Sequence, residues 1–425
     1  MNVMVIGGGG REHVLAAQLA RSKRVAKVYC APGNAGTAAV AENLPANMED
    51  MDGLVGLALD RRIDLTVVGP EAPLCAGIVD RFEAAGLRIF GPTKAAARIE
   101  GDKAYAKRLM KLAHVPTAEA RIFERYKQAR DYVASRDTGV VVKASGLAAG
   151  KGVSVCEDPA DALIVLEKIM VDHQFGDAGK TVVVEEILQG QEVSIHALVS
   201  GHTIYVLDSA QDHKRIGEGD TGANTGGMGA YSPAPVATED VIRVVQSDVL
   251  VPIVDAMQSD GAPYRGVLYA GLMLTPGGPK VLEFNCRFGD PEAQVILSRL
   301  DSDLFELLMV TVEGRLEEAD VRWNPKPAVC VVMASRGYPG EYAKGLPITG
   351  LEAASSLPDV HVFHSGTRRV GDHIITAGGR VFGVTALGAD LAAAQRRAYD
   401  AVQQIHFDGA CFRRDIAGRA GPTGA

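Results

Sequence analysis

The first hundred residues repeat one pattern that restricts the fold more than any other feature of the chain. Short apolar runs end in glycine or proline turns, and segments with helical spacing of apolar residues follow them. The runs and turns are VMVIGGGG, KVYCAPG, DLTVVGPEAPL and LRIFGP. Strands that alternate with helices form parallel sheets, and the loops at the carboxyl ends of the strands line a binding crevice. The pattern predicts a Rossmann-like α/β domain over residues 1–101.

The remainder of the chain has α+β patterns. Residues 102–114 have the spacing of an amphipathic helix, and strand patterns then flank a glycine-rich loop. We expect a small lobe at about 118–188 that covers a ligand, within a larger domain at 102–322. Short strands and a last helix predict a C-terminal α+β domain at 323–420, and the small, polar residues 418–425 are typical of a disordered tail.

Composition excludes several classes of protein. The formal charge of -8 gives no basic field for a polynucleotide. The six cysteines are far apart and form no C-x-x-C pair, which is typical of reduced core residues. No apolar run approaches the ~18 residues of a membrane helix. We therefore expect a cytoplasmic protein that binds neither nucleic acid nor a membrane.

The stretch KASGLAAGKGV, residues 143–153, indicates a phosphate-binding loop of an unusual kind. It is not a P-loop, because three residues separate Gly146 from Gly150 and Gly152 follows Lys151 in place of Ser or Thr. Glycines let the backbone approach a ligand, and successive N–H groups in a tight turn can bind an anion. Lys143 and Lys151 would add positive charge. The alternative is a plain glycine-rich hairpin with exposed lysines.

The stretch KVLEFNCRFGDPE predicts a metal site on a strand. Side chains alternate along a strand, so Glu283 and Asn285 share a face, and Arg287 continues the alternation. Two oxygen ligands suit magnesium, which usually completes its coordination with water and substrate phosphates. The alternative is the polar face of an edge strand.

A nicotinamide enzyme is disfavoured. The GGGGREH turn lacks the third glycine of G-x-G-x-x-G in both registers, and no acidic residue for an adenosine ribose follows the second strand in CAPGNAG. A turn at the N-terminus of a helix still suits a single phosphate or ribose.

Taken together, these motifs resemble the phosphoribosylamine-glycine ligase family of ATP-grasp enzymes, in which two α+β lobes clamp ATP. GGREH, APGNAGT, VGPEAPL, KASGLAAGKGV, SAQDHKR, NTGGMGAYSPAP, GLMLT and EFNCRFGDPE occur in the family order over residues 3 to about 416. The chain departs from the usual family residues at four loop positions. Gly8 stands where Asn or Ser is common, Asp102 where Ser is frequent, Ser145 where Asp often stands, and Ala223 where Pro often stands. These departures affect fine positioning and leave the expected charges in place.

The resemblance implies an activity. ATP, with Mg²⁺ or Mn²⁺, would activate glycine as glycyl phosphate, and 5-phosphoribosylamine would displace the phosphate. The products would be glycinamide ribonucleotide, ADP and phosphate, in de novo purine biosynthesis. The expected assembly is a monomer or weak dimer, open to a transient contact with the preceding enzyme of the pathway.

The resemblance also assigns roles to residues. Glu283 and Asn285 would bind the metal, and Arg287, Asp212 and Lys214 would be catalytic. The ATP residues would be Lys103, Lys143, Gly146, Gly150, Lys151, Gly152, Glu185, Glu186, Leu188 and Glu192. The substrate residues would be Gly9, Gly10, Arg11, Glu12, Asn34, Gly36, Thr37, Glu71, Asp290 and His364.

Alternatives stay open at this stage. His13 is equally compatible with helix packing, and His364 with a structural role. Residues 212–215 could form a solvated charge run. A sibling ATP-grasp carboxylase would share the ATP residues and activate bicarbonate, and an ATP-responsive binding protein would bind the nucleotide without turnover.

Overall fold

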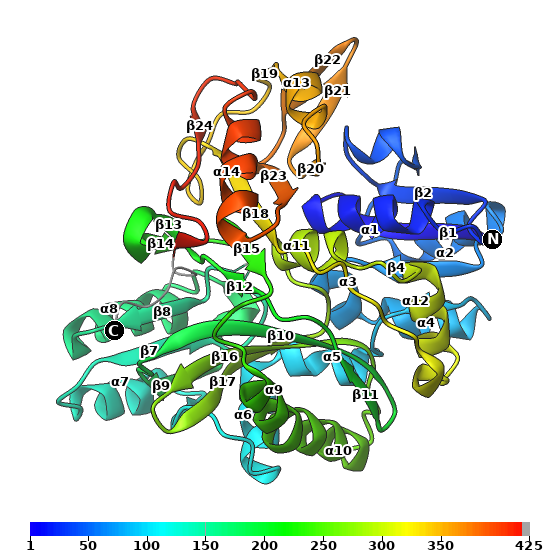
Figure 1. The fold of residues 1–425 in the computed structure, drawn as a ribbon. Coiled ribbons are helices and arrows are strands. Elements are labelled where there is room, and N and C mark those ends of the chain that lie inside the picture. Colours follow the sequence, from blue (N-terminus) through cyan, green and yellow to red (C-terminus); the bar gives the residue numbers. More distant parts are fainter. Residues whose placement is uncertain (149, 419–425) are drawn as a thin grey trace.

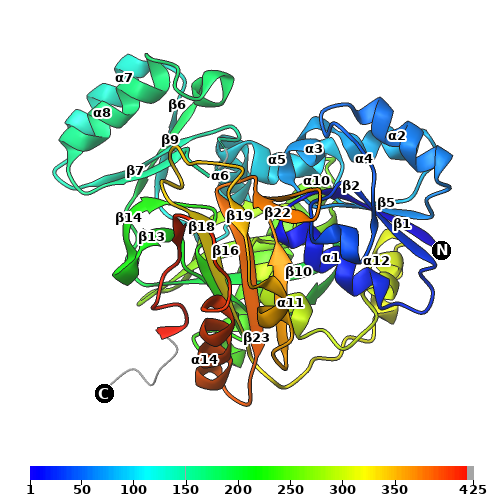
Figure 2. The same cartoon turned by 90° about the horizontal axis from the view of Figure 1, so that it is seen from above.

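The computed structural model describes residues 1–148 and 150–418. Apart from Gly418, the predicted tail at 418–425 lies outside the described residues. Three regions follow one another around the molecule, with the small lobe and the N-terminal sheet at opposite ends in both views (Figures 1 and 2).

The N-terminal sheet is parallel, as the repeated pattern predicts. Its strands are β1 (Asn2–Gly7), β2 (Lys27–Pro32), β3 (Glu42–Asn43), β4 (Leu65–Val68) and β5 (Ile89–Phe90), in the order β3-β2-β1-β4-β5. The helices of this region are α1 (Gly10–Ala20), α2 (Met51–Asp60), α3 (Glu71–Ala76) and α4 (Ile78–Ala84). The strand order reverses between β1 and β4, so the turns after these two strands meet where ligands bind in open α/β sheets.

The small lobe is an antiparallel sheet with two helices. Helices α5 (Lys94–Gly101) and α6 (Lys103–Leu112) lead into it. The sheet has the order β6-β9-β7-β8, and its elements are β6 (Ala120–Phe123), α7 (Tyr126–Ala134), β7 (Val140–Ala144), β8 (Val153–Cys156), α8 (Pro159–Met170) and β9 (Val182–Glu186). Its buried apolar residues, including Val142, Leu166 and Val184, form a core of their own. The glycine-rich loop joins β7 to β8.

A second antiparallel sheet lies beside the lobe, in the order β11-β10-β16-β17. Its strands are β10 (Gln191–Ser200), β11 (Thr203–Val206), β16 (Arg265–Thr275) and β17 (Gly278–Asn285). Helices α9 (Glu239–Val245) and α10 (Val251–Ser259) precede β16, and α11 (Glu292–Ser298) and α12 (Leu304–Val312) follow β17. Two antiparallel sheets of this kind form the predicted ATP-grasp architecture.

The C-terminal sheet takes strands from two distant parts of the chain. Its order is β12-β15-β18-β23-β20, and β24 also pairs with β18. Its strands are β12 (Gln211–Asp212), β15 (Gly229–Ser232), β18 (Ala328–Ser335), β20 (Val360–His364), β23 (Arg380–Leu387) and β24 (Ala410–Cys411). The polar stretch that interrupts the central domain in sequence therefore joins this sheet through β12 and β15.

Smaller elements complete the C-terminal region. A three-stranded sheet contains β19 (Pro347–Ile348), β21 (Thr367–Val370) and β22 (His373–Thr376). The helices are α13 (Leu351–Ser355) and α14 (Leu391–Val402), and a hairpin of β13 (Arg215–Gly217) and β14 (Thr221–Asn224) projects from the polar stretch. Within the part of the chain that the structure describes, no helix combines the length and apolar character needed to span a bilayer.

Candidate active site

Lys143 lies at the end of β7 in a buried group of charges. Its Nζ is 2.9 Å from Glu185 Oε2 and also donates to the carbonyl of Leu282 at 2.9 Å. The other oxygen of Glu185 lies 3.1 Å from the Nζ of Lys107, and all three charged side chains are at least nine-tenths buried. Burial lowers the pKa of Lys107 to about 8, although Glu185 opposes the shift. Glu185 therefore orients two lysines with its side chain, a role not foreseen from sequence.

Lys103 begins helix α6 beside the glycine-rich loop. Its backbone N–H donates to the carbonyl of Ser145 at 2.8 Å, and the N–H of Ala104 donates to the Ser145 hydroxyl at 2.9 Å. Asp102 is the N-cap of α6 and accepts from the N–H of Tyr105. Ser145, which directly follows β7, thus accepts the first two backbone N–H groups of α6, the helix that carries Lys103.

The glycine-rich loop is tightly built where it leaves β7. The Gly146 N–H donates to the Ala178 carbonyl at 3.0 Å, and a Cβ at Gly146 would lie 2.7 Å from the Cα of Ala178. Gly150 has φ +76, and the Lys151 N–H donates to Ala148 at 2.9 Å. Two of the expected anion donors are thus bonded within the protein, and phosphate binding by Gly146, Gly150, Lys151 and Gly152 stays a prediction.

The connection from β9 to β10 joins the two sheets. Glu186 ends β9, where its carboxylate accepts from the Glu119 N–H at 3.0 Å and pairs with Lys280 at 3.2 Å. Leu188 is half-buried in the connection, and Glu192 follows at the start of β10. The predicted adenine and ribose residues therefore lie where the small lobe meets the second sheet.

Glu283 lies among cations near the end of β17. Burial alone would raise the pKa of its carboxyl, but neighbouring positive charges hold the pKa below the ordinary value. These charges belong to Lys214, Lys103, Lys143 and Arg287. Asn285 is buried on the same strand, and its Oδ1 accepts from Arg287 Nη2 at 3.1 Å. Four cations from four segments of the chain thus lie near enough to Glu283 to lower the pKa of its carboxyl.

Two acidic residues hold the Arg287 guanidinium. Its Nη2 is 2.9 Å from Glu100 Oε1, and its Nε is 3.4 Å from Glu71, the first residue of α3. The other oxygen of Glu100 accepts from the Cys286 N–H at 2.7 Å. Sequence analysis missed Glu100, because an acidic residue at the end of a helix carries no signal for a distant arginine.

Asp212 is buried and Lys214 is half-buried, so these two residues do not form a fully solvated charge run. Asp212 is 7% exposed, and burial raises the pKa of its carboxyl well above the usual range. Lys214 Nζ lies 3.1 Å from Glu192 Oε2. Burial alone would lower the pKa of Lys214, but Glu192 and Asp212 raise it. Lys214 therefore keeps its charge near neutral pH.

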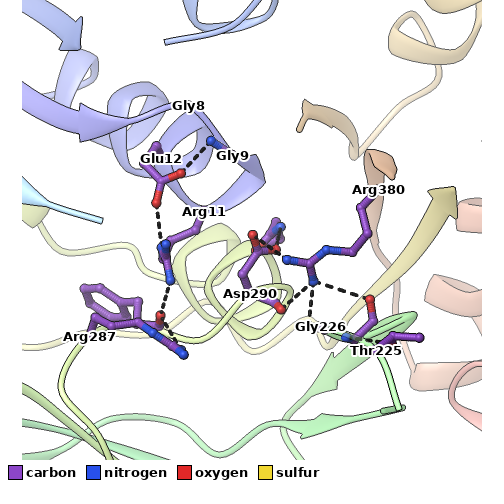
Figure 3. Close-up of polar contacts among 12 residues, drawn as sticks. Gly8, Gly9, Arg11, Glu12, Thr225, Gly226, Arg287, Asp290 and Arg380 are labelled. Carbon is purple, nitrogen blue, oxygen red and sulfur yellow. Dashed lines mark hydrogen bonds and ion pairs between the residues drawn. The ribbon is translucent and has the colours of Figure 1, made fainter. Parts of the chain in front are cut away.

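The predicted substrate turn after β1 is filled by Glu12 (Figure 3). Glu12 Oε2 accepts from the Gly9 N–H at 2.5 Å, and Oε1 pairs with Arg11 Nε at 2.6 Å. Arg11 Nη1 reaches the carbonyl of Phe288 at 3.2 Å. A Cβ at Gly69, in the turn after β4, would lie 2.0 Å from Glu12 Oε1. The carboxylate thus occupies the point where the strand order reverses.

Asn34, Gly36 and Thr37 form a loop bonded to itself and to the C-terminal region. Asn34 accepts from the N–H groups of Gly36 and Thr37 at 2.8 and 3.0 Å, and it donates to the His364 carbonyl at 2.7 Å. The Thr37 hydroxyl is fully buried and donates to Asn43 at 2.7 Å. These groups shape the loop, and their contact with substrate stays a prediction.

His13 and His364 pack together where α1 meets β20. His13 Nδ1 accepts from the His364 N–H at 2.8 Å, and the two rings meet edge to face at 5.6 Å. Burial lowers the pKa of His13 to about 3 and that of His364 to about 4. Both rings are therefore neutral near pH 7, and helix packing describes the observed contacts of His13.

Asp290 lies between the substrate turn and the C-terminal sheet (Figure 3). Its Oδ1 accepts from Gln294 at 2.8 Å, and its Oδ2 is 3.1 Å from Arg380 Nη2. Burial alone would raise the pKa of Asp290, but Arg380 and Arg11 hold it below the ordinary value. Sequence analysis missed Arg380, which begins β23 far along the chain.

Comparison with known proteins agrees with this arrangement over the whole chain. Three models of phosphoribosylglycinamide synthetase match: the N domain at residues 1–100, the ATP-grasp (A) domain at 101–293 and the C domain at 328–419. The chain belongs to the phosphoribosylglycinamide synthetase family. The predicted fold class and the resemblance to this family are confirmed, and the ATP-grasp match supports ATP as the nucleotide.

Individual proteins that resemble this chain support the same family assignment. A phosphoribosylamine--glycine ligase of Rhodopirellula baltica is 50% identical over 99% of this chain and 98% of that protein. The crystal structure of phosphoribosylamine--glycine ligase from Thermotoga maritima has a TM-score of 0.84 at 32% identity, covering 98% of this chain and all of the other. A biotin carboxylase from Campylobacter jejuni has a TM-score of 0.73 at 15% identity, covers 97% of this chain and 92% of the other, and shares the fold alone.

Proposed function

We propose that this chain ligates glycine to 5-phosphoribosylamine at the expense of ATP, giving glycinamide ribonucleotide, ADP and phosphate. The observation that supports the proposal best is that the positive charges of Lys214, Lys103, Lys143 and Arg287 together hold the pKa of Glu283 below its ordinary value in spite of burial. Such a concentration of positive charge suits a triphosphate and an acyl phosphate, in which negative charge builds up during transfer. The family match and the full-length relatives favour this activity over other ATP-grasp reactions.

In the first step, a glycine carboxylate oxygen attacks the γ-phosphorus, and the bond to the β-phosphate oxygen breaks to release ADP. Lys143 and Lys103 would hold the phosphates, and Arg287 would stabilise the charge that develops on the transferred group. Glu71 and Glu100 keep the Arg287 guanidinium in one orientation. The product is glycyl phosphate.

In the second step, the amine nitrogen of 5-phosphoribosylamine forms a bond with the glycyl carbonyl carbon. The bond from that carbon to the phosphate oxygen breaks, and the amine loses one proton. Asp212 would accept this proton in its ionised form, which the positive charge of Lys214 favours. Lys214 stays charged beside it and would stabilise the departing phosphate.

Glu283 and Asn285 fit a divalent cation. Both supply oxygen atoms from one strand, and the cations around Glu283 keep it ionised. Within residues 1–148 and 150–418, no group of three or more His, Cys, Asp or Glu side chains is arranged to hold a metal. Two protein oxygens match the preference of Mg²⁺ for water and substrate phosphates as its remaining ligands. When bound, Mg²⁺ or Mn²⁺ would neutralise phosphate charge during transfer.

Mass spectrometry of the products tests the proposal. The protein is mixed with ATP, Mg²⁺, glycine and freshly made 5-phosphoribosylamine, alongside Glu283→Ala and the exposed control Glu352→Ala. We expect glycinamide ribonucleotide from the wild type and Glu352→Ala but not from Glu283→Ala. ATP turnover stimulated only by bicarbonate would replace the proposal with a carboxylase, and binding of ATP without turnover would replace it with a binding protein.

A further inference from the structure

Arg380 of the C-terminal sheet bonds to two segments of the candidate active site. Its Nη1 donates to the carbonyl of Asp290 at 2.7 Å and to that of Gly226 at 2.6 Å. Its Nη2 forms the ion pair with the Asp290 carboxylate. One guanidinium therefore ties the polar stretch after β11 to the turn after β17, as Figure 3 shows.

Two side chains of the C-terminal region hold the backbone N–H and carbonyl of Gly226. The Gly226 N–H donates to the Tyr338 hydroxyl at 3.0 Å, while its carbonyl accepts from Arg380. A Cβ on Gly226 would lie 3.1 to 3.3 Å from the guanidinium, closer than a side chain normally approaches. The backbone N–H and carbonyl of Gly226 are thus fixed by side chains that follow it by 112 and 154 residues in the sequence.

The fixed turn leads directly to Lys214. Thr225 precedes Gly226, and both its N–H and its hydroxyl donate to the Lys214 carbonyl at 2.8 Å. The position of Lys214 therefore depends on Thr225, and that of Thr225 on the hydrogen bonds of Gly226.

The other group that Arg380 holds, Asp290, borders the N-terminal substrate turn. A Cβ at Gly9 would lie 3.5 Å from Asp290 Oδ2, so the carboxylate rests against that turn. Gln294 fixes the second oxygen. Arg380 thus joins the residue beside the predicted amine substrate to the loop that carries Lys214.

We propose that Arg380 is a positioning residue for the ligation step, which brings Asp290 and the Lys214 loop into register around glycine and the amine substrate. The inference rests on the proposed ligase function and extends it to the C-terminal region. The Arg380 side chain is 19% exposed. A small cation in solution therefore has access to its position.

Arg380→Met and Arg380→Lys test this role in the full-length protein. Misplacement of reacting groups by about 1 Å can lower the rate of a reaction about a hundredfold. We expect kcat/KM for glycine and for 5-phosphoribosylamine to fall by roughly that factor in Arg380→Met, with the Kd of ATP within about twofold of the wild type. Arg380→Lys keeps the charge but loses the planar fork, so we expect it to stay impaired.

Two further measurements separate positioning from a loss of folding. Guanidinium ion at low concentration should restore part of the activity of Arg380→Met and none to Arg380→Lys. Asp290→Asn combined with Arg380→Met should be no worse than the more impaired of the two single variants. Arg397→Met serves as the matched control. Arg397 lies on α14 of the same region and, like Arg380, donates to an aspartate, Asp359, at 3.0 Å.

Wild-type kcat/KM in both Arg380 variants would overturn the inference. So would an ATP affinity that falls as much as the ligation rate, or additive losses in the Asp290 combination. Failure of the wild-type protein to form glycinamide ribonucleotide would instead overturn the proposed function.

Discussion

The Ser145 hydroxyl donates to Asp102 Oδ1 at 2.7 Å and joins the glycine-rich loop to the N-terminus of the helix that carries Lys103. The family resemblance implies the reverse pair, Ser at 102 and Asp at 145. On that expectation, this chain keeps the hydroxyl–carboxylate contact with the two partners exchanged.

This exchange predicts a rescue. Ser145→Ala removes the acceptor of the Ala104 N–H, and loss of a side-chain acceptor at a helix N-terminus costs about 1 kcal/mol. We expect the Kd of ATP, measured by calorimetry, to rise about fivefold. Ser145→Asp alone places two carboxylates together and should be worse, whereas Asp102→Ser with Ser145→Asp should bind like the wild type. Ser135→Ala is the control, and a double variant as weak as Ser145→Asp would contradict the prediction.

Lys107→Met tests the buried charge group at Glu185. The substitution leaves Lys143 as the remaining lysine on that carboxylate, so Glu185 should draw Lys143 away from the nucleotide. We expect ATP to bind about tenfold more weakly, which corresponds to about 1.4 kcal/mol. Lys111→Met, on the exposed face of the same helix, should bind normally. Unchanged ATP affinity in a folded Lys107→Met protein would show that Lys107 serves packing alone.

The His13–His364 contact predicts acid sensitivity of the N-terminal and C-terminal interface. The folded-state pKa values of about 3 and about 4 lie below the unfolded value near 6.5, so unfolded chains bind more protons as pH falls. The stability contribution is fully present above pH 6.5 and is lost as pH falls toward 4 for His364 and toward 3 for His13. Because the unfolded chain takes up a proton at each histidine, the free energy of unfolding at pH 5 should be roughly 2 kcal/mol lower per ring than above pH 6.5.

Thermal unfolding between pH 7 and pH 5 measures this loss. His13→Asn retains a hydrogen-bond acceptor without the titration, so its Tm should fall less over this range than that of the wild type. His202→Asn, at an exposed site, is the control. Equal pH slopes for His13→Asn and the wild type would rule out the mechanism.

The separate core of the small lobe predicts motion on nucleotide binding. An acyl phosphate must be shielded from water, and the nucleotide must still exchange, so we expect the lobe to open and close. Hydrogen exchange in residues 143–148 and 150–153 should slow when ATP binds. The N-terminal strand β1 provides the reference, and unchanged protection of the loop would contradict the prediction.

The sequence predicted those parts of the site that depend on local pattern. Period-two alternation predicted that Glu283 and Asn285 lie on one strand, and glycine spacing predicted a loop after Lys143, and both elements are present. The ligands of these residues stay predictions. Glu100, Lys107 and Arg380 were missed, because each acquires its partner from a distant segment and has an ordinary local setting. Strand β12 was missed because two residues, Gln211 and Asp212, are too short for a periodic signal.

The mixed origin of the C-terminal sheet has a consequence for synthesis of the protein. Strand β15 pairs with β12 on one side, but its neighbour on the other side, β18, is made about a hundred residues later, and Arg380 is made later still. Chains fold progressively from the N-terminus as they leave the ribosome. A nascent chain can therefore complete the nucleotide-clamping sheets while the Lys214 loop lacks its supports. Its competence for the ligation step should arrive only near the end of translation.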